Sequence, residues 1–299
     1  MSQQDRPFLF LISSSRQTAA LIAFPSESGL GRATRGEIGP LGEIVENKVP
    51  DVEMWLDRLY VSAEGAGLRD EDKRKAVEVA AILAEIERAL CRHSRRTPIT
   101  LVDAAAGKSY VGLLAAKLIF EPSGLTASVV TLERDPARAA ASGRAAKRLN
   151  SSLPVDCRAT DIASASAWPC RPDIVAALHA CGPAADAVID RTIAAEAQVL
   201  LLVPCCTSRS VPAAARAEVE AERLGIPRQA PVRRRFVQAW VDAARTLRLE
   251  AAGYHTEVVE FVGSRITPHN LLWRSRRVLE PVRMSEAARK LEKFLPTFP

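Results

Sequence analysis

Short apolar runs and longer amphipathic stretches alternate along the middle of this chain, from residue 97 to residue 203. Short apolar runs are typical of buried strands, and a hydrophobic repeat of about 3.6 residues is typical of helices. Their regular alternation predicts a parallel sheet with helices on both faces. The expected strands cover residues 99–102, 129–132 and 155–159, with two more within residues 173–182 and 200–206 and a final pair at residues 257–261 and 271–274.

Amphipathic helices are predicted before and after this region. Residues 51–60 have helical spacing, and residues 285–295 predict a C-terminal helix capped by Ser285. Residues 69–92 carry one apolar stripe, with charged residues elsewhere that include Glu71, Lys75, Glu78 and Glu87. Further helices are expected over residues 135–149, where Asp135 is the N-cap, over residues 184–197 and, with a break at residues 225–227, after residue 206.

The ends of the chain differ from its middle in pattern. Residues 8–24 predict a hairpin, and residues 29–50 are rich in glycine, proline and charge, which predicts a loop. We therefore expect a small N-terminal α/β extension over residues 1–68, a main domain over residues 69–280 and a C-terminal helix within residues 281–299.

The first expected strand ends in an acidic residue and a loop of small side chains. Asp103 follows the strand, and residues 104–107 read Ala-Ala-Ala-Gly before a helical pattern begins near Val111. Small residues let a ligand approach the backbone closely, and the free N–H groups at a helix N-terminus face such a ligand. This loop is therefore the first candidate binding site.

Three loop patterns compete for these residues. A phosphate-binding P-loop explains Gly107, Lys108 and Ser109, but its first glycine would fall on Val102 inside the strand. A dinucleotide-binding fingerprint needs several glycines, and this loop has one. The pattern Asp/Glu-x-Gly-x-Gly-x-Gly of class I S-adenosylmethionine (SAM) methyltransferases keeps Gly107, with Ala105 and Ser109 replacing its outer glycines. The loop alone leaves these alternatives open.

Acidic residues also follow the second and third expected strands. Glu133 ends the second strand, where a carboxylate accepts the hydroxyl protons of a ribose in nucleotide-binding βαβ units. The separation between Asp103 and Glu133 is larger than the about 20 residues that are usual in such units. This difference predicts an insertion at residues 121–124. Asp161 follows the third strand and can accept from an adenine amino group, with the apolar Ile162 beside the ring. Together with Asp103, these acids suit an adenosyl ligand.

Three later segments resemble one family of methyltransferase domains. They are residues 173–182 (Asp-Ile-Val-Ala-Ala-Leu-His-Ala-Cys-Gly), 200–206 (Leu-Leu-Leu-Val-Pro-Cys-Cys) and 267–272 (Thr-Pro-His-Asn-Leu-Leu). The family includes the eukaryotic tRNA acceptor-stem ribose methyltransferases and bacterial relatives, and its first loop usually reads Asp-x-Gly-x-Gly-Lys-Gly/Ser, close to residues 103–109. The resemblance covers residues 83–274, and the Cys/His zinc modules of the eukaryotic enzymes have no counterpart in this sequence.

The resemblance implies a fold, a cofactor and a set of binding residues. The fold is α/β, with a Rossmann-like class I methyltransferase sheet that is mostly parallel and has an antiparallel closing pair. The cofactor is SAM, and the methyl acceptor is left open. Lys108 would hold a carboxylate, either that of the cofactor or that of Asp103, or would simply be solvated. The residues expected to hold SAM are Asp103, Ala105, Gly107, Lys108, Glu133, Asp161 and Ile162.

Candidate catalytic residues follow the fourth and fifth expected strands. His179 stands where such enzymes meet the acceptor, and a histidine there can remove a proton from a hydroxyl group or a ring nitrogen. Alternatively, it is a structural histidine bonded to its loop. Cys181 follows the fourth strand, and Cys205 and Cys206 follow the fifth. Cysteine-dependent RNA pyrimidine methyltransferases place catalytic cysteines after these strands, so covalent catalysis is one hypothesis; thiols that simply fit a tight loop are the other.

The charge of the chain permits a nucleic-acid partner without requiring one. Lys plus Arg exceed Asp plus Glu by 41 to 35, and the pI is about 9.2. The hydrophobic fraction of 47% and the charged fraction of 25% are typical of a globular protein. The densest basic group lies beyond the fifth strand, where it would bind RNA phosphates, and nothing indicates DNA specificity. It consists of Arg228, Arg233, Arg234 and Arg235.

Six cysteines lie in a chain that shows no secretory segment and no apolar run of the ~20 residues needed to span a bilayer. We therefore expect a cytoplasmic protein with reduced thiols and no membrane partner. Zinc usually needs two close Cys or His pairs, and Cys91 with His93 has no second pair near it in the sequence. No metal site is predicted.

The sequence thus predicts a SAM-dependent methyltransferase that acts on RNA by in-line displacement at the methyl group. Within the same enzyme class, the alternative is a small-molecule or protein methyltransferase. Outside it, the alternatives are a P-loop-like nucleotide-binding protein and a non-catalytic SAM-binding module.

Overall fold

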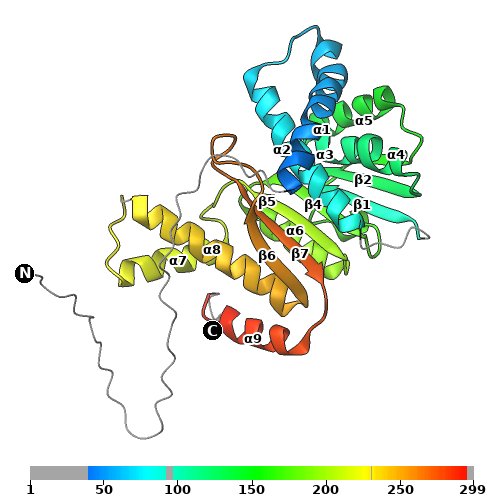
Figure 1. Cartoon of the computed structure of the whole chain (residues 1–299). Coiled ribbons are helices and arrows are strands. Elements are labelled where there is room, and N and C mark those ends of the chain that lie inside the picture. Colours follow the sequence, from blue (N-terminus) through cyan, green and yellow to red (C-terminus); the bar gives the residue numbers. More distant parts are fainter. Residues whose placement is uncertain (1–39, 92–96, 230, 295–299) are drawn as a thin grey trace, which may run out of the picture. The chain divides into compact units, whose positions relative to one another are not determined.

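Figure 1 shows a computed structural model of the chain, which describes residues 40–91, 97–229 and 231–294. The described residues form one compact unit built on a seven-stranded sheet with the order β3-β2-β1-β4-β5-β7-β6. Neighbours among β1 to β5 are parallel, whereas β7 runs antiparallel to both β5 and β6, which confirms the predicted sheet. The strands are β1 Ile99–Ala104, β2 Ala127–Glu133, β3 Val155–Ala159, β4 Ile174–Ala180, β5 Val199–Pro204, β6 Tyr254–Glu260 and β7 Leu271–Arg277.

Helices cover both faces of the sheet, because successive strand residues point to opposite faces. Leu101 of β1 packs into one hydrophobic cluster with α1, α2 and α3, while the next residue, Val102, packs into a second cluster with α6 and α8. Both side chains are fully buried, so the strands carry the core on both sides. The helices are α1 Pro40–Leu56, α2 Asp70–Leu90, α3 Tyr110–Ala115, α4 Glu121–Ser123, α5 Pro136–Leu149, α6 Pro183–Ala194, α7 Pro212–Arg223, α8 Pro231–Ala251 and α9 Pro281–Leu291.

The predicted helices of the main domain are confirmed. α2 corresponds to the amphipathic helix expected over residues 69–92, and the break expected at residues 225–227 separates α7 from α8. Asp135 caps α5, since its carboxylate accepts hydrogen bonds from the N–H groups of Ala137 and Arg138 at 2.8 and 3.2 Å. Local sequence patterns were therefore sufficient to predict these helices and the cap of α5.

Two predictions nearer the ends of the chain are wrong. The loop expected over residues 29–50 is helical from Pro40 onwards, because residues such as Val49 pack against the core and their burial outweighs the loop signals. Ser285 does not cap the last helix. α9 begins earlier, at Pro281, whose fixed φ suits the first helical position.

The hairpin expected over residues 8–24 lies outside the described residues. The domain boundary expected at residue 68 stays a prediction, and α1 and α2 contribute to the same core cluster. Within the described ranges, no helix has both the length and the apolar character that a bilayer crossing requires.

Candidate cofactor and acceptor site

The three acidic residues predicted to hold the cofactor lie at the ends of three neighbouring strands, β1, β2 and β3. Asp103 is the next-to-last residue of β1, Glu133 ends β2, and Asp161 follows β3. The backbone N–H of Thr160 donates to the Glu133 carbonyl at 2.9 Å, which joins the second and third strand ends. The structure therefore brings these residues to one edge of the sheet, where open parallel sheets bind ligands.

The loop after β1 has the backbone of a glycine-rich loop at all three positions where the methyltransferase pattern has glycine. Ala105, Gly107 and Ser109 have φ angles of 52°, 58° and 60°, in the left-handed region that favours glycine. Ser109 is fully buried, and its hydroxyl donates to Ser142 Oγ at 3.0 Å. Ser142 in turn donates to the Gly107 carbonyl at 3.3 Å. This pair of serines holds the loop in the conformation that glycine would otherwise adopt freely.

The P-loop alternative does not match this geometry. The position of its first glycine, Val102, is fully buried inside β1 and hydrogen-bonded in register with β2, so it cannot form part of a phosphate-binding loop.

The residues around this loop fit an adenosyl group. A side chain at Gly107 would meet open space, so a ligand can approach the backbone there. Glu133 accepts from Gly107 N at 2.8 Å and from Asp135 N at 2.9 Å, one bond to each carboxylate oxygen, and each oxygen keeps a lone pair for a ribose hydroxyl. Asp161 is exposed, so its carboxylate is available to the amino group at the edge of an adenine ring. Ile162 beside it is buried and offers an apolar contact to the face of that ring.

The Asp103 carboxylate bonds to the helix α3 rather than to the loop before it. The Asp103 side chain is 2% exposed, and its carboxylate accepts from Gly112 N of α3 at 2.8 Å. A methyl group at Gly112 would lie 3.0 Å from the Asp103 Cβ, so glycine permits this close approach of α3 to β1. Burial raises the pKa of Asp103 to about 7, the Gly112 hydrogen bond opposes that rise, and the charge of Glu133 adds to it. Asp103 thus anchors the helix behind the loop.

Lys108 contacts an aromatic residue from outside the region of family resemblance. Its backbone carbonyl accepts from the Tyr60 hydroxyl at 2.5 Å, and its Nζ lies 5.8 Å from the centre of the Tyr60 ring. Tyr60 also meets Tyr110 edge to face, with 4.7 Å between ring centres. Helical spacing predicted Tyr60 as a core residue, and no signal in the sequence indicated its contact with this loop.

His179 lies at an irregularity near the end of β4. The register of β4 with β5 shifts between Leu178 and Ala180, and His179 itself has a φ of 65°. Its Nε2 lies 2.9 Å from Oε2 of Glu78 on α2. The amphipathic pattern of residues 69–92 placed Glu78 on the charged side of the helix, but the structure buries it to 5% exposure.

Glu78 is held as a carboxylate despite its burial. Burial pushes its pKa upward, but hydrogen bonds from His179 and Lys75 outweigh this effect, so that the pKa of Glu78 is lowered overall. A carboxylate that accepts from Nε2–H leaves Nδ1 of His179 as the acceptor nitrogen. The pair therefore fixes both the orientation and the tautomer of the histidine.

The predicted cysteines converge, but two of them are bonded to each other. A disulfide joins Cys181 and Cys205, with 5.3 Å between their Cα atoms, and Cys206 is a free, exposed cysteine. The expectation of reduced thiols is therefore wrong for this pair, and Cys205 has no free nucleophilic thiol in this form. The physical reason is strand order: Ala180 and Pro204 are paired on neighbouring strands, so the residues after them lie side by side.

A cleft of about 1050 Å³ opens beyond the end of β5, and we call it the acceptor cleft. Its walls come from the loop after β5, from α7 and α8, and from residues 268–271. A smaller cleft of about 790 Å³ lies near Asp173 and Val199, where β4 and β5 begin. The acceptor cleft borders the end of β5, beside the strand that carries His179.

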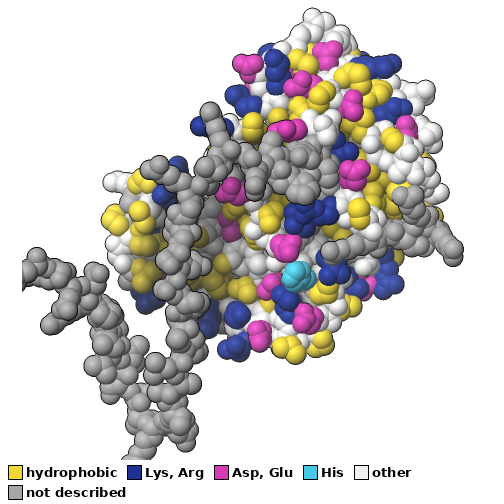
Figure 2. Space-filling model, in the orientation of Figure 1, with side chains coloured by type: hydrophobic (Ala, Val, Ile, Leu, Met, Phe, Trp, Pro, Cys, Tyr) yellow, Lys and Arg dark blue, Asp and Glu magenta, His cyan; other side chains and the backbone are white. Residues whose placement is uncertain are grey.

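The predicted basic group lines this cleft, but one of its four arginines is buried. Arg228, Arg234 and Arg235 are exposed and line the acceptor cleft, together with Arg209. Arg233 is 5% exposed; it donates to Glu218 Oε2 at 2.7 Å and to the Ile226 and Glu218 carbonyls at 2.8 and 2.9 Å. The guanidinium of Arg233 is thus already bonded within the protein, and phosphate binding by Arg233 stays a prediction. On the face shown in Figure 2, basic and acidic side chains are interspersed.

Comparison with known proteins agrees with this geometry. Residues 74–210 match a family model described as a methyltransferase domain. The fold and the strand-end site define a class I methyltransferase domain, and the family match falls on that part of the chain. The protein is a SAM-dependent methyltransferase, with SAM as its cofactor. No curated protein matches the sequence.

Solved structures of methyltransferases align with the chain at low identity. Magnesium protoporphyrin IX methyltransferase from Synechocystis PCC 6803 with bound SAH is 13% identical, with 79% of this chain and 99% of that chain covered and a TM-score of 0.44. An SAH-bound methyltransferase from Podospora anserina is 13% identical over 77% and 88%, with a TM-score of 0.44. The ribosomal protein L11 methylase from Lactobacillus delbrueckii is 13% identical over 68% and 80%, with a TM-score of 0.37. Because these scores are low, the assignment rests on the family match and the site.

Proposed function

We propose that this SAM-dependent methyltransferase methylates RNA bound in the acceptor cleft. The observation that carries the proposal is the position of exposed arginines along that cleft, which opens at the end of β5, two strands from β1 in the same sheet. Arg209, Arg234 and Arg235 supply planar groups that bind phosphate oxygens through two hydrogen bonds. Arg228 also lines the cleft but is paired with Glu222 at 2.6 Å, so it is less available.

The residues of the chain divide the work of methyl transfer among them. When bound, SAM would supply a methyl group on a sulfonium for displacement by an acceptor atom held in line. The loop at Gly107 and the Glu133 carboxylate would hold the cofactor, with Ile162 beside its base. His179, held by Glu78, removes the proton of the acceptor, an effect worth about 10²–10⁴ in rate. In the disulfide form Cys181 and Cys205 have no thiol that could take part in this step.

Incubation with radiolabelled SAM and separate fractions of total RNA, protein and metabolites tests the proposal. We expect label in the RNA fraction. Label in protein or metabolites would overturn RNA as the acceptor while leaving the transferase activity in place. Tight SAM binding without transfer to any fraction would indicate a non-catalytic SAM-binding module.

A further inference from the structure

We propose that Cys181, Cys205 and Cys206 form a binding site for a thiophilic divalent metal ion, with Zn²⁺ as the expected occupant. The three Sγ atoms lie within 4.8 Å of one another. Tetrahedral coordination with Zn–S bonds of about 2.3 Å places thiolate sulfurs roughly 3.8 Å apart, so all three can reach one ion with small side-chain movements. Among the described residues, this is the one group of His, Cys, Asp or Glu side chains with such an arrangement.

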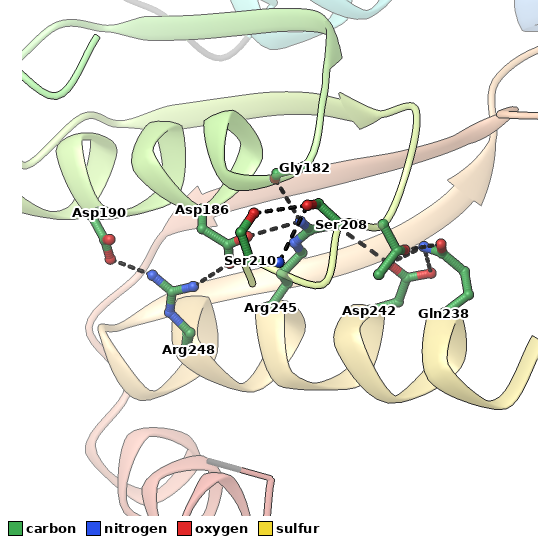
Figure 3. A network of polar contacts seen from close by, with 10 residues as sticks. Gly182, Asp186, Asp190, Ser208, Ser210, Gln238, Asp242, Arg245 and Arg248 are labelled. Atoms are coloured by element: carbon green, nitrogen blue, oxygen red, sulfur yellow. Dashed lines mark hydrogen bonds and ion pairs between the residues drawn. The ribbon is translucent and has the colours of Figure 1, made fainter. Parts of the chain in front are cut away.

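The backbone keeps these sulfurs together without the disulfide. The N–H of Gly182 donates to the Cys206 carbonyl at 3.2 Å, which ties the loop after β4 to the loop after β5. Arg245 of α8 is 1% exposed and donates to the Gly182 carbonyl at 3.1 Å and to Asp186 at 2.8 Å (Figure 3). Reduction of the disulfide therefore releases two thiols into a frame that still holds them beside Cys206.

The number of sulfurs favours a metal site over a simple disulfide. A disulfide uses Cys181 and Cys205 and leaves Cys206 without a part, although it comes to the same place from the same loop. A two-electron reductant, such as a phosphine or a dithiol, first converts the Cys181–Cys205 disulfide to two thiols. A metal ion then uses all three cysteines as thiolates, and its binding releases their protons. Thiolate ligands select zinc among the common divalent ions, because soft ligands prefer it to Mg²⁺ or Ca²⁺.

Three protein ligands leave one coordination position open. Zinc sites with three protein ligands and one exchangeable position are typical of catalytic rather than structural zinc. Cys206 also lines the acceptor cleft, so the open position lies at the margin of that cleft. It would take water or a nitrogen, oxygen or sulfur atom of the acceptor.

Metal binding by the full chain tests the proposal without reference to methyl transfer. The protein is reduced with a phosphine, desalted and titrated with Zn²⁺, and separately with Co²⁺, whose visible spectrum reports tetrahedral thiolate ligands. We expect about one Zn²⁺ per chain in the reduced protein and none in the oxidised protein. Cys206→Ser should weaken Zn²⁺ binding at least about tenfold, because the loss of a residue that only supports a metal ligand already costs that much.

Two further variants make the test decisive. Cys170→Ser is the matched control, since Cys170 is also free and exposed but lies outside the cluster, and it should bind Zn²⁺ as the parent does. Cys181→Ser should lose binding as Cys206→Ser does, which covers the case in which one variant fails to fold. A folded, reduced protein that binds neither ion, or a Cys206→Ser variant that binds Zn²⁺ as tightly as the parent, would overturn the proposal.

Discussion

Glu78 on α2 and His179 at the end of β4 are 101 residues apart in the chain, and 2.9 Å separates Glu78 Oε2 from His179 Nε2. The carboxylate is buried and also paired with Lys75, so it holds the histidine ring in one orientation beside the cofactor edge of the sheet. A histidine oriented by a buried carboxylate is suited to accept a proton through its other nitrogen.

We expect Glu78→Gln to lower kcat by about tenfold or more, because the amide keeps a polar contact to His179 but removes the charge that orients it and stabilises its protonated form. The KM for SAM should change little, since the Glu78 carboxylate is bonded to His179 and Lys75 rather than to the loop at Gly107. Steady-state kinetics with the labelled acceptor fraction measures both constants. Glu71→Gln is the matched control, because Glu71 is an exposed carboxylate on the same helix. Equal kcat values for Glu78→Gln and the parent would remove the pair from the mechanism.

Asp103 makes the stability of the fold depend on pH. Its pKa is about 7 in the folded chain, mainly because of burial, and about 3.9 in an unfolded chain. The folded state thus binds more protons than the unfolded state between about pH 4 and pH 7. The free energy of unfolding therefore falls through this window as pH rises, by up to about 1.4 kcal/mol per pH unit.

Asp103→Asn should remove this part of the pH dependence, since the amide oxygen still accepts from Gly112 N and carries no charge to desolvate. Urea unfolding at a series of pH values compares the two proteins. We expect their difference to grow in favour of the variant from about pH 4 to about pH 7 and then to level off. Parallel curves would show that Asp103 does not titrate as described.

The left-handed backbone at Ala105 predicts a stabilising substitution. Ala105→Gly removes the cost of a side chain at a φ of 52° and should raise the free energy of unfolding by up to about 1 kcal/mol, with SAM affinity retained. Ala106→Gly is the control on the same loop, because Ala106 does not have a positive φ, and it should stabilise nothing. Thermal unfolding of the two variants decides between them, and loss of stability in Ala105→Gly would contradict the loop geometry.

How far the sequence predicts this protein depends on the range of the interactions involved. The strands of the sheet and the cap of α5 follow from local patterns, and the structure confirms them. The loop after β1 has the left-handed backbone that its pattern predicts, and its role in binding SAM stays a prediction. The sequence could not predict the partner of His179, the burial of Glu78 or the disulfide. Each depends on residues that only the packing of separate elements brings together. The same holds for the cysteine cluster: Cys181 and Cys205 lack metal-ligand spacing in the sequence and meet because β4 and β5 are neighbours.

Neighbouring arginines of α8 should respond differently to substitution. Arg234→Ala combined with Arg235→Ala should weaken RNA binding without reducing stability. For single-stranded RNA, the slope of log affinity against log salt should become shallower by about 0.7 for each phosphate that the variant no longer neutralises. Arg233→Ala should instead cost about 1–3 kcal/mol of stability, because it leaves Glu218 and the Ile226 carbonyl without their partner.

Fluorescence anisotropy at several salt concentrations measures the effect of the double substitution on RNA binding, and urea unfolding measures the effect of Arg233→Ala on stability. RNA binding that the double substitution leaves unchanged would show that the acceptor cleft is not the RNA site.

The cofactor site is tested most directly by the affinity for SAM of the parent and of Glu133→Ala, measured by isothermal calorimetry. Glu133 holds the loop through Gly107 N and offers its carboxylate to the ribose, so its removal should abolish measurable binding while circular dichroism shows an intact fold. Glu121→Ala is the matched control, because the Glu121 carboxylate is paired with Lys117 rather than with the loop, and it should bind SAM as the parent does. If Glu133→Ala binds SAM as tightly as the parent, the cofactor site is not at these strand ends.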